Sequence, residues 1–198
     1  MMAIDGFKVN ISRAMELGEL HKSLSSIVTK ALNVDDLLRS QIVMSVSALD
    51  YYVHEVVRQG MLEIYEGARG AVPGFSRFQV SLSDAQASIP GASSLWLDSV
   101  IRQSHSFLSF QSPEKISDAI RIIHEPALWP GLEVRMGVPA KDLKAQLKLI
   151  VDRRNKIAHE ADADPSYPGV RWPISYNDAY AAAEFIDQLV SAIDAEVN

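Results

Sequence analysis

The spacing of apolar residues along the chain predicts helices from its first third onward. Between positions 10 and 32, apolar side chains recur every three or four residues, which is the pattern of an amphipathic helix with one buried face. Asn33 is expected to end this helix. A longer helix is expected from a cap at Asp35 or Asp36 to about Tyr65. At about 3.6 residues per turn it makes roughly nine turns, so we expect it to form the spine of a bundle.

The residue pattern in the middle of the chain, residues 67–138, predicts an elaboration of short helices joined by turns. Glycine and proline residues interrupt the helical pattern at its start, and Pro90-Gly91 is expected to be a turn. The elements expected here are a cap at Ser83 or Ser94, helical spacing from Leu95 to Phe110, and a cap at Ser112 with Pro113 at the first helical position of a helix that stops before Pro126. Trp129-Pro130-Gly131 is expected to close this section.

Two further helices are expected in the last third of the chain. Pro139 opens one of them, which runs from Ala140 to about Ala161. Residues 164–173 contain too much proline for anything but a loop. Ser175, with an aspartate three residues later, resembles a capping box that begins a last amphipathic helix. Because no strand alternation persists, the fold class is predicted to be all-α, an antiparallel helical bundle.

Composition narrows the class of protein. The chain has 198 residues, 47% of them hydrophobic, which is enough to bury one core, so we expect residues 1–198 to form a single domain. There is no cysteine, which excludes disulfides and thiolate metal sites. No apolar run approaches membrane-spanning length and no secretory signal pattern opens the chain, so a cytoplasmic protein without membrane contact is expected.

The net charge of −6 and the pI near 5.3 argue against a protein that coats nucleic acid through bulk electrostatics. Any nucleic-acid contact must therefore be local. An acidic protein can still hold a ribonuclease site, since a cleft with a few cations can engage a few phosphates.

The helix opened by Pro139 carries the segment with the clearest chemistry, Arg153-Arg154-Asn155-Lys156-Ile157-Ala158-His159-Glu160. On an ideal helical wheel, Arg154 falls on the apolar seam. A guanidinium there is costly to bury unless it is paired or faces a polar cleft. The other members of the seam are Leu143, Leu147, Ile150, Ile157 and Ala161, and the opposite, polar side carries Lys141, Lys144, Lys148, Asn155 and His159.

Arg154 and His159 diverge on that wheel by about 140°, so one straight helix does not bring the two groups together. The length of the arginine side chain, a distortion near the helix end or a second subunit must bring the two groups together. The divergence makes a site assembled across a homodimer more plausible than one completed within a single protomer.

The run from Arg154 to His159 matches the signature of the HEPN superfamily, which is an arginine, a polar residue, three further residues and a histidine. The segment Ala48-Leu49-Asp50-Tyr51-Tyr52-Val53-His54-Glu55 and the loop with Arg171-Trp172-Pro173-Ile174 add to the match. The sequence therefore resembles the RiboL-PSP-HEPN branch. The resemblance implies a HEPN-type bundle, with residues 67–138 as an elaboration of extra short helices.

The resemblance also implies metal-independent cleavage of RNA by homodimers, without a cofactor, often as a toxin or phage-defence effector under an antitoxin or partner protein. Arg154 and His159 would be catalytic. A histidine can take the proton of a ribose 2'-hydroxyl, and an arginine fork can hold the phosphate. The alternatives are a non-catalytic HEPN module that binds a nucleotide or a partner protein, and an arginine in an interhelix salt bridge beside a surface histidine.

Further residues are expected to support the site. Asn155 shares the face of His159. Asp50 and His54 lie one turn apart on the second helix and are interpreted as a metal pair or as support for the catalytic groups. The favoured alternative for these two residues is a buried hydrogen bond between helices. The predicted substrate-binding residues are Lys148, Arg153 and Trp172. For Arg153 the alternative is an ion pair, for Lys148 a solvated face, and for Trp172 a core aromatic.

Overall fold

The computed structural model describes residues 2–29, 32–87 and 93–198, and these residues form α-helices joined by loops. Apart from one isolated bridge between Ala163 and Arg171, the described residues contain no strand pairing, which confirms the all-α prediction. The helices of the described part are α1 Ala3–Ser25, α2 Asp36–Tyr65, α3 Pro73–Ser76, α4 Leu82–Ala87, α5 Leu95–His105, α6 Pro113–Ile120, α7 Leu128–Met136, α8 Ala140–Glu160 and α9 Tyr176–Val197.

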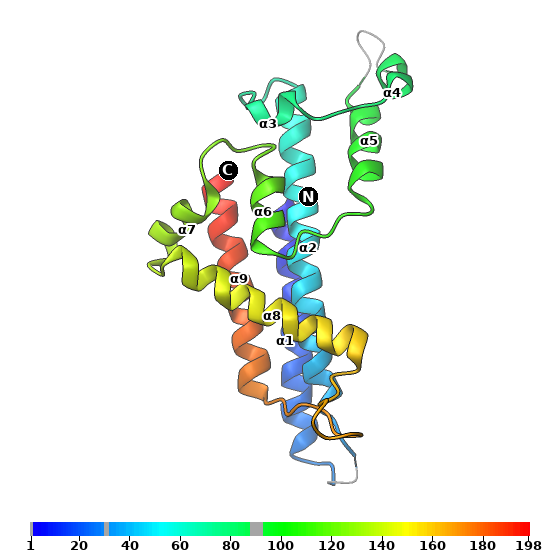
Figure 1. Ribbon diagram of the computed structural model, residues 1–198, viewed down its shortest axis with the longest axis vertical. Coiled ribbons are helices and arrows are strands. Elements are labelled where there is room, and N and C mark those ends of the chain that lie inside the picture. The colour runs from blue at the N-terminus through cyan, green and yellow to red at the C-terminus, as the bar shows by residue number, and fades with distance from the viewer. Residues whose placement is uncertain (1, 30–31, 88–92) are drawn as a thin grey trace.

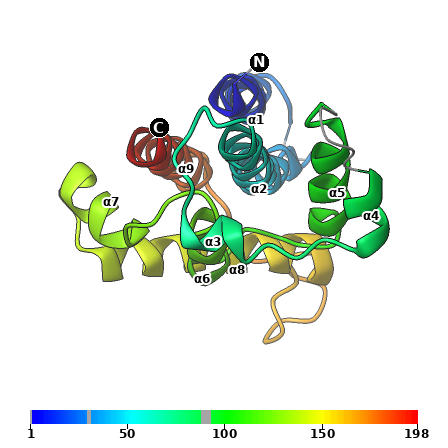
Figure 2. The same ribbon diagram turned by 90° about the horizontal axis from the view of Figure 1, so that it is seen from above.

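Three long helices, α1, α2 and α9, run along the length of the molecule, with α1 antiparallel to the other two (Figure 1). Seen from above, α8 crosses one side of this group, and α6 lies between α8 and α2 (Figure 2). The short helices predicted in the middle segment are α3 to α7, and α5 and α7 lie on opposite flanks. The molecule is thus an antiparallel bundle with a crossing helix.

The core is built around α2, as its predicted role as the spine requires. Leu49, Tyr52 and Val53 of this helix are fully buried against its neighbours. The Tyr52 ring meets Phe7 of α1 edge-on, with ring centroids 5.9 Å apart, and its hydroxyl donates to Asp194 of α9 at 3.0 Å. One residue of α2 therefore ties together all three long helices.

The first helix was predicted from residue 10 to residue 32, but α1 begins at Ala3 and ends at Ser25. Its apolar face starts earlier than the prediction allowed, because Ala3 and Phe7 are buried and continue the same three- and four-residue spacing. Asn33 does not end the helix. Its side chain instead accepts a hydrogen bond from the backbone N–H of Asp35 at 2.8 Å, in the turn before α2.

Trp129-Pro130-Gly131, which were expected to close the middle section, lie inside α7. Pro130 is tolerated because it falls in the first helical turn, where backbone N–H groups have no partner within the helix. The helical spacing from Leu95 to Phe110 forms a helix only as far as His105. The Pro90-Gly91 turn lies outside the described residues.

Local capping signals were predicted correctly at two helices. The Ser112 hydroxyl accepts from the backbone N–H of Lys115 at 3.3 Å at the start of α6, and the Ser175 hydroxyl accepts from the backbone N–H of Asp178 at 3.2 Å at the start of α9. The end of α8 comes one residue earlier than predicted. Ala161, with a φ of 53°, has left the helical conformation and is not part of the helix.

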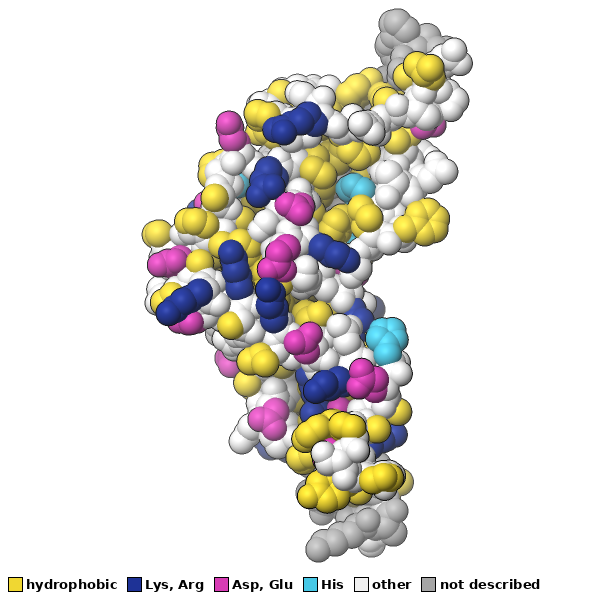
Figure 3. Space-filling view, viewed as in Figure 1, with side chains coloured by type: hydrophobic (Ala, Val, Ile, Leu, Met, Phe, Trp, Pro, Cys, Tyr) yellow, Lys and Arg dark blue, Asp and Glu magenta, His cyan; other side chains and the backbone are white. Residues whose placement is uncertain are grey.

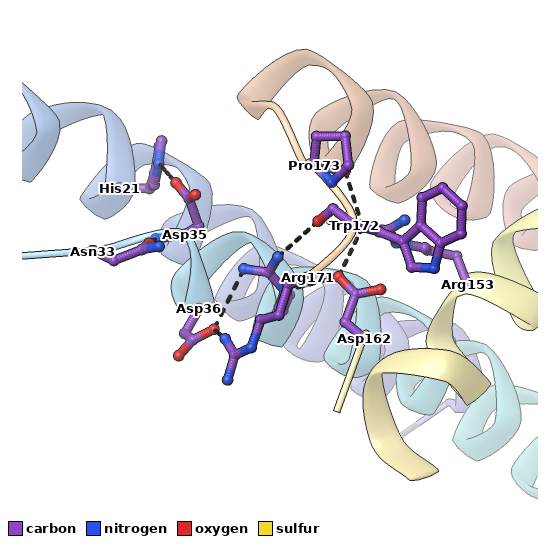
Figure 4. A network of polar contacts seen from close by, with 10 residues as sticks. His21, Asn33, Asp35, Asp36, Arg153, Asp162, Arg171, Trp172 and Pro173 are labelled. Carbon is purple, nitrogen blue, oxygen red and sulfur yellow. Dashed lines mark hydrogen bonds and ion pairs between the residues drawn. The ribbon is translucent and has the colours of Figure 1, made fainter. Parts of the chain in front are cut away.

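A buried carboxylate fastens the end of α8 to α2. Asp162 is 0% exposed, and its Oδ2 accepts from Arg39 Nε and from Arg153 Nη2, both at 2.8 Å. We call these three side chains the Asp162 cluster, and Figure 4 labels Arg153 and Asp162. Arg39 Nη2 also donates to the carbonyl of Trp172 at 2.9 Å. Two guanidiniums compensate the charge of a carboxylate that water does not reach, and they join α2, α8 and the loop before α9.

None of the helices in the described ranges has the length and apolar character that crossing a bilayer would require.

Replacing Asp162 by asparagine should destabilise the fold strongly. The substitution keeps the size of the side chain and its tolerance of positive φ, but it removes the buried carboxylate between two guanidiniums and leaves Arg39 only its 3.4 Å ion pair with the exposed Asp36. We expect the free energy of unfolding to fall by about 3 kcal/mol in urea titrations. Asp152→Asn removes an exposed carboxylate of α8 and should change the free energy of unfolding by less than about 0.5 kcal/mol. Equal stability of the two variants would contradict this account.

Candidate functional site

Arg154 lies half-buried on the side of α8 that packs on the bundle. Leu143, Leu147 and Ile150 of the predicted seam are buried, and Ile157 packs against the core from its edge. The prediction that Arg154 shares this seam is therefore correct. Ala161 was also assigned to the seam, but it is exposed beyond the end of the helix.

Two neutral amides hold the guanidinium of Arg154. Its Nη1 donates to Asn155 Oδ1 at 2.9 Å, and its Nη2 donates to Gln111 Oε1 in the connection between α5 and α6. Within the described residues, no carboxylate lies at ion-pair distance from this guanidinium. Arg154 is thus oriented by hydrogen bonds that leave its positive charge unneutralised.

The other arginines that the fold shields from solvent are treated differently. Each of them is paired with a carboxylate: Arg39 and Arg153 with Asp162, Arg58 with Glu55 and Asp98, and Arg69 with Glu63. The hydrogen bonds to these acids raise the pKa of Arg58, although its burial opposes the shift most strongly. Arg154 differs from the other shielded arginines of the described chain because no carboxylate neutralises its charge, which therefore remains available to bind an anion.

Asp50 and His54 of α2 lie behind Gln111, as seen from Arg154. Asp50 Oδ2 accepts from Gln111 Nε2 at 3.0 Å, and its Oδ1 accepts from the backbone N–H of Phe110 at 2.6 Å. His54 Nε2 is 3.8 Å from Asp50 Oδ1. The acid therefore reaches Arg154 through an amide rather than by contact, and it fastens a loop to α2 rather than one helix to another.

The rest of the His54 environment is apolar and aromatic. Its ring centroid lies 4.5 Å from that of Phe110 and 6.1 Å from that of His105, which is buried. Burial lowers the pKa of His105, and the neighbouring His54 lowers it further. In the described ranges no group of three or more histidine, aspartate or glutamate side chains is placed to hold a metal ion.

His159 lies exposed in the last turn of α8, and it makes no hydrogen bond or ion pair within the described chain. Because α8 is continuous from Ala140 to Glu160, the ideal angle of about 140° between Arg154 and His159 applies. The structure thus brings Arg154 together with Asn155 and, through Gln111, with Asp50. It does not bring His159 of the same chain to them.

The face that α8 crosses is mixed in charge, with basic and acidic side chains interleaved along it (Figure 3). The outline of this face is indented between α5 and the C-terminal end of α8. A basic stripe therefore does not dominate this face, in keeping with the net charge of −6.

The three predicted substrate-binding residues have partners within the chain. Lys148 Nζ lies 2.8 Å from Glu114 of α6, and its hydrogen bond lowers the pKa of that carboxyl, although both side chains are exposed. Arg153 belongs to the Asp162 cluster. The half-buried Trp172 ring lies under Lys156, whose Nζ is 5.6 Å from the ring centroid. The backbone carbonyl of Trp172 accepts a hydrogen bond from Arg39.

Sequence reasoning missed three residues that shape this region: Gln111, Arg39 and Asp162. Arg39 had a detectable signal, because it lies beside Leu38 and three residues before Ile42 on the buried stripe of α2. Asp162 directly follows a helix end and carried no pattern of its own. Gln111 is 43 positions from Arg154, in a connection between two short helices, and no spacing rule joins them.

Comparison with known proteins identifies the family of the chain. Searches of curated proteins and of solved structures gave no match. The model of one protein family, described as RiboL-PSP-HEPN, matches residues 9–198, a range that includes α8 with Arg154 and His159 as well as the whole middle segment. The chain belongs to the RiboL-PSP-HEPN family.

Proposed function

We propose that this protein is a metal-independent endoribonuclease that uses Arg154 and His159 at a site shared by two copies of the chain. The observation that carries the proposal is the state of Arg154, which is half-buried, oriented by two amides and not neutralised by any carboxylate of the described chain. An oriented and uncompensated guanidinium is suited to bind a phosphate in bidentate fashion. Its position in the motif of a HEPN-type family supports a catalytic role.

The chemistry follows from the two side chains. His159 takes the proton of a ribose 2'-hydroxyl, and the 2'-oxygen attacks the adjacent phosphorus. Arg154 binds the phosphate oxygens and stabilises the charge that develops on them. The bond to the 5'-oxygen breaks, this oxygen takes up a proton from solvent, and the products carry a 2',3'-cyclic phosphate and a 5'-hydroxyl.

A second copy of the chain completes the site in this proposal. His159 points away from Arg154 on the same helix, so the histidine that works with a given arginine comes from the other protomer of a homodimer. A role as a toxin or phage-defence effector, restrained by an antitoxin or other partner protein, is the biological setting that we propose for this activity.

A second candidate function is a non-catalytic module that binds a nucleotide or a partner protein. The exposed position of His159, which has no polar partner to orient it in the described chain, favours this alternative. Such a module would use Arg154 to bind a phosphate without cutting RNA, and the cleavage assays below separate the two functions.

The two neighbouring arginines should give opposite phenotypes. Arg154→Ala should lower RNA cleavage by at least ~10²-fold while the free energy of unfolding changes little, because its partners are a loop amide and a neighbouring side chain. Arg154→Lys should recover little, since a point charge does not replace a bidentate fork.

Arg153→Ala should show the reverse. It removes one countercharge of the buried Asp162 and should lower the free energy of unfolding by about 2 kcal/mol, while the folded fraction still cleaves RNA. Urea titrations and cleavage of a labelled RNA measure the two effects. Equal activity of the two alanine variants would show that the motif arginine is wrongly assigned.

Two inactive variants should restore activity when their subunits are mixed. A dimer with one Arg154→Ala chain and one His159→Ala chain keeps one arginine and one histidine on opposite protomers. After subunit exchange, we expect the mixture to recover about a quarter of the wild-type activity, because about half of the dimers are mixed and each keeps one of its two sites.

The control mixture contains Arg154→Ala and the doubly substituted chain, and it should stay inactive. Sedimentation must show a dimer at micromolar concentration. A monomer, or no recovery although subunit exchange is complete, would contradict a shared site.

Cleavage should be specific to RNA and should survive EDTA. DNA lacks the 2'-oxygen and should stay intact, as should an RNA with one 2'-deoxy nucleotide at the cut site. His159→Ala should cleave ~10²- to 10⁴-fold more slowly and keep its fold, because the exposed histidine contributes little packing. Mass spectrometry of the products should find cyclic phosphate ends. Cutting of DNA, or a requirement for Mg²⁺, would refute this mechanism.

A further inference from the structure

The connection between α5 and α6 brings a residue of the middle segment to the motif helix. This connection passes across α2 and close to α8 in both views of the bundle (Figure 1, Figure 2). Gln111 at its end bonds Asp50 of α2 on one side and Arg154 of α8 on the other. Three segments far apart in sequence therefore meet at one side-chain amide.

Donor and acceptor chemistry fixes the direction of this amide. Arginine only donates, so it must face Gln111 Oε1, and an ionised aspartate only accepts, so it must face Gln111 Nε2. Asp50 is itself held by the backbone N–H of Phe110 at 2.6 Å, in the residue before Gln111. A flipped amide would set two donors against each other at Arg154 and two acceptors against each other at Asp50.

We infer that Gln111 is a positioning residue for Arg154: a neutral spacer through which Asp50 orients the guanidinium without neutralising it. The inference rests on the proposed function of Arg154 as a phosphate-binding group. A carboxylate in direct contact would hold the guanidinium equally well, as Asp162 holds Arg153, but it would compete with the phosphate. An amide in between transmits the direction and keeps the charge available.

This inference gives the middle segment a part in the site. Gln111 reaches Arg154 because Asp50 ties the connection to α2 and because the buried Phe110 side chain packs beside His54. The short helices then contribute to the site, because the connection between two of them carries the residue that orients Arg154.

Three variants test the spacer. Gln111→Glu adds a carboxylate that can pair with Arg154, Gln111→Ala removes the bridge, and Gln146→Glu makes the same chemical change at an exposed position of α8. With a short RNA at pH 8, we expect kcat/KM of Gln111→Glu to fall about tenfold or more, mainly through KM, because the phosphate must displace an ion pair. Gln111→Ala should fall mainly in kcat, and Gln146→Glu should stay near the wild type.

The dependence on pH separates positioning from a general structural effect. A protonated carboxyl donates to Asp50 and accepts from Arg154 as the amide does, so the activity of Gln111→Glu relative to the wild type should rise as the pH falls from 8 to 5.5. Among the described residues, the charged or titratable groups linked to position 111 by the contacts above are Asp50 and His54 on α2, His105 on α5 and Arg154 on α8. Gln111→Ala should have no such recovery. Equal losses in both variants at every pH would overturn the inference.

A measurement without substrate keeps this inference distinct from the proposed function. The NMR signal of the Arg154 Nε–H group, assigned by its loss in Arg154→Lys, should shift in Gln111→Glu, broaden in Gln111→Ala and stay in place in Gln146→Glu. If the wild type cuts no RNA but these changes occur, the ribonuclease proposal fails and the positioning contact stands. If the signal neither shifts nor broadens in the two Gln111 variants, the contact is absent and the inference is wrong.

Discussion

The buried carboxylate of Asp162 is the constraint on which the geometry of the site depends. Water does not reach it, so Arg39 from α2 and Arg153 from α8 must both approach it. Together with the buried apolar seam of α8, this arrangement holds the helix in one rotation about its own axis. Because Arg154 follows Arg153, it must lie about 100° further round the helix, which directs it toward Gln111 and Asn155. The way α8 is held against the bundle thus sets the direction of Arg154.

Adjacent arginines illustrate how the environment decides the use of one side chain type. Arg153 Nη2 meets a carboxylate and two backbone carbonyls, so the charge of Arg153 is neutralised within the fold. Arg154 meets only amide oxygens in the described chain and keeps its charge. The first arrangement favours stability, and the second favours recognition of an anion at the cost of holding an uncompensated cation half out of water. A locally basic site is in this way compatible with a protein of net charge −6.

The position of His159 sets the geometric requirement that the proposed catalytic site must meet. A continuous α8 carries the histidine away from Arg154, and the exposed last turn offers it no partner within the described chain. The proposed dimer satisfies this requirement without distorting α8. The mixed charges on the face that α8 crosses agree with local contacts to a few phosphates rather than with a long track for nucleic acid (Figure 3).

The sequence by itself determined whatever short-range pattern encodes. Apolar spacing predicted the helices α2, α8 and α9, and serine caps predicted the starts of α6 and α9. The apolar seam of α8 also predicted that Arg154, the arginine of the proposed site, lies on the side of the helix that packs on the bundle. Tertiary structure alone decided the partners. Arg39 and Asp162 are 123 positions apart, and Gln111 and Arg154 are 43 apart, so their contacts depend on how helices pack rather than on residue spacing. Periodicity records which face of a helix is buried, whereas the side chain that meets a buried charge is chosen only when distant elements come together.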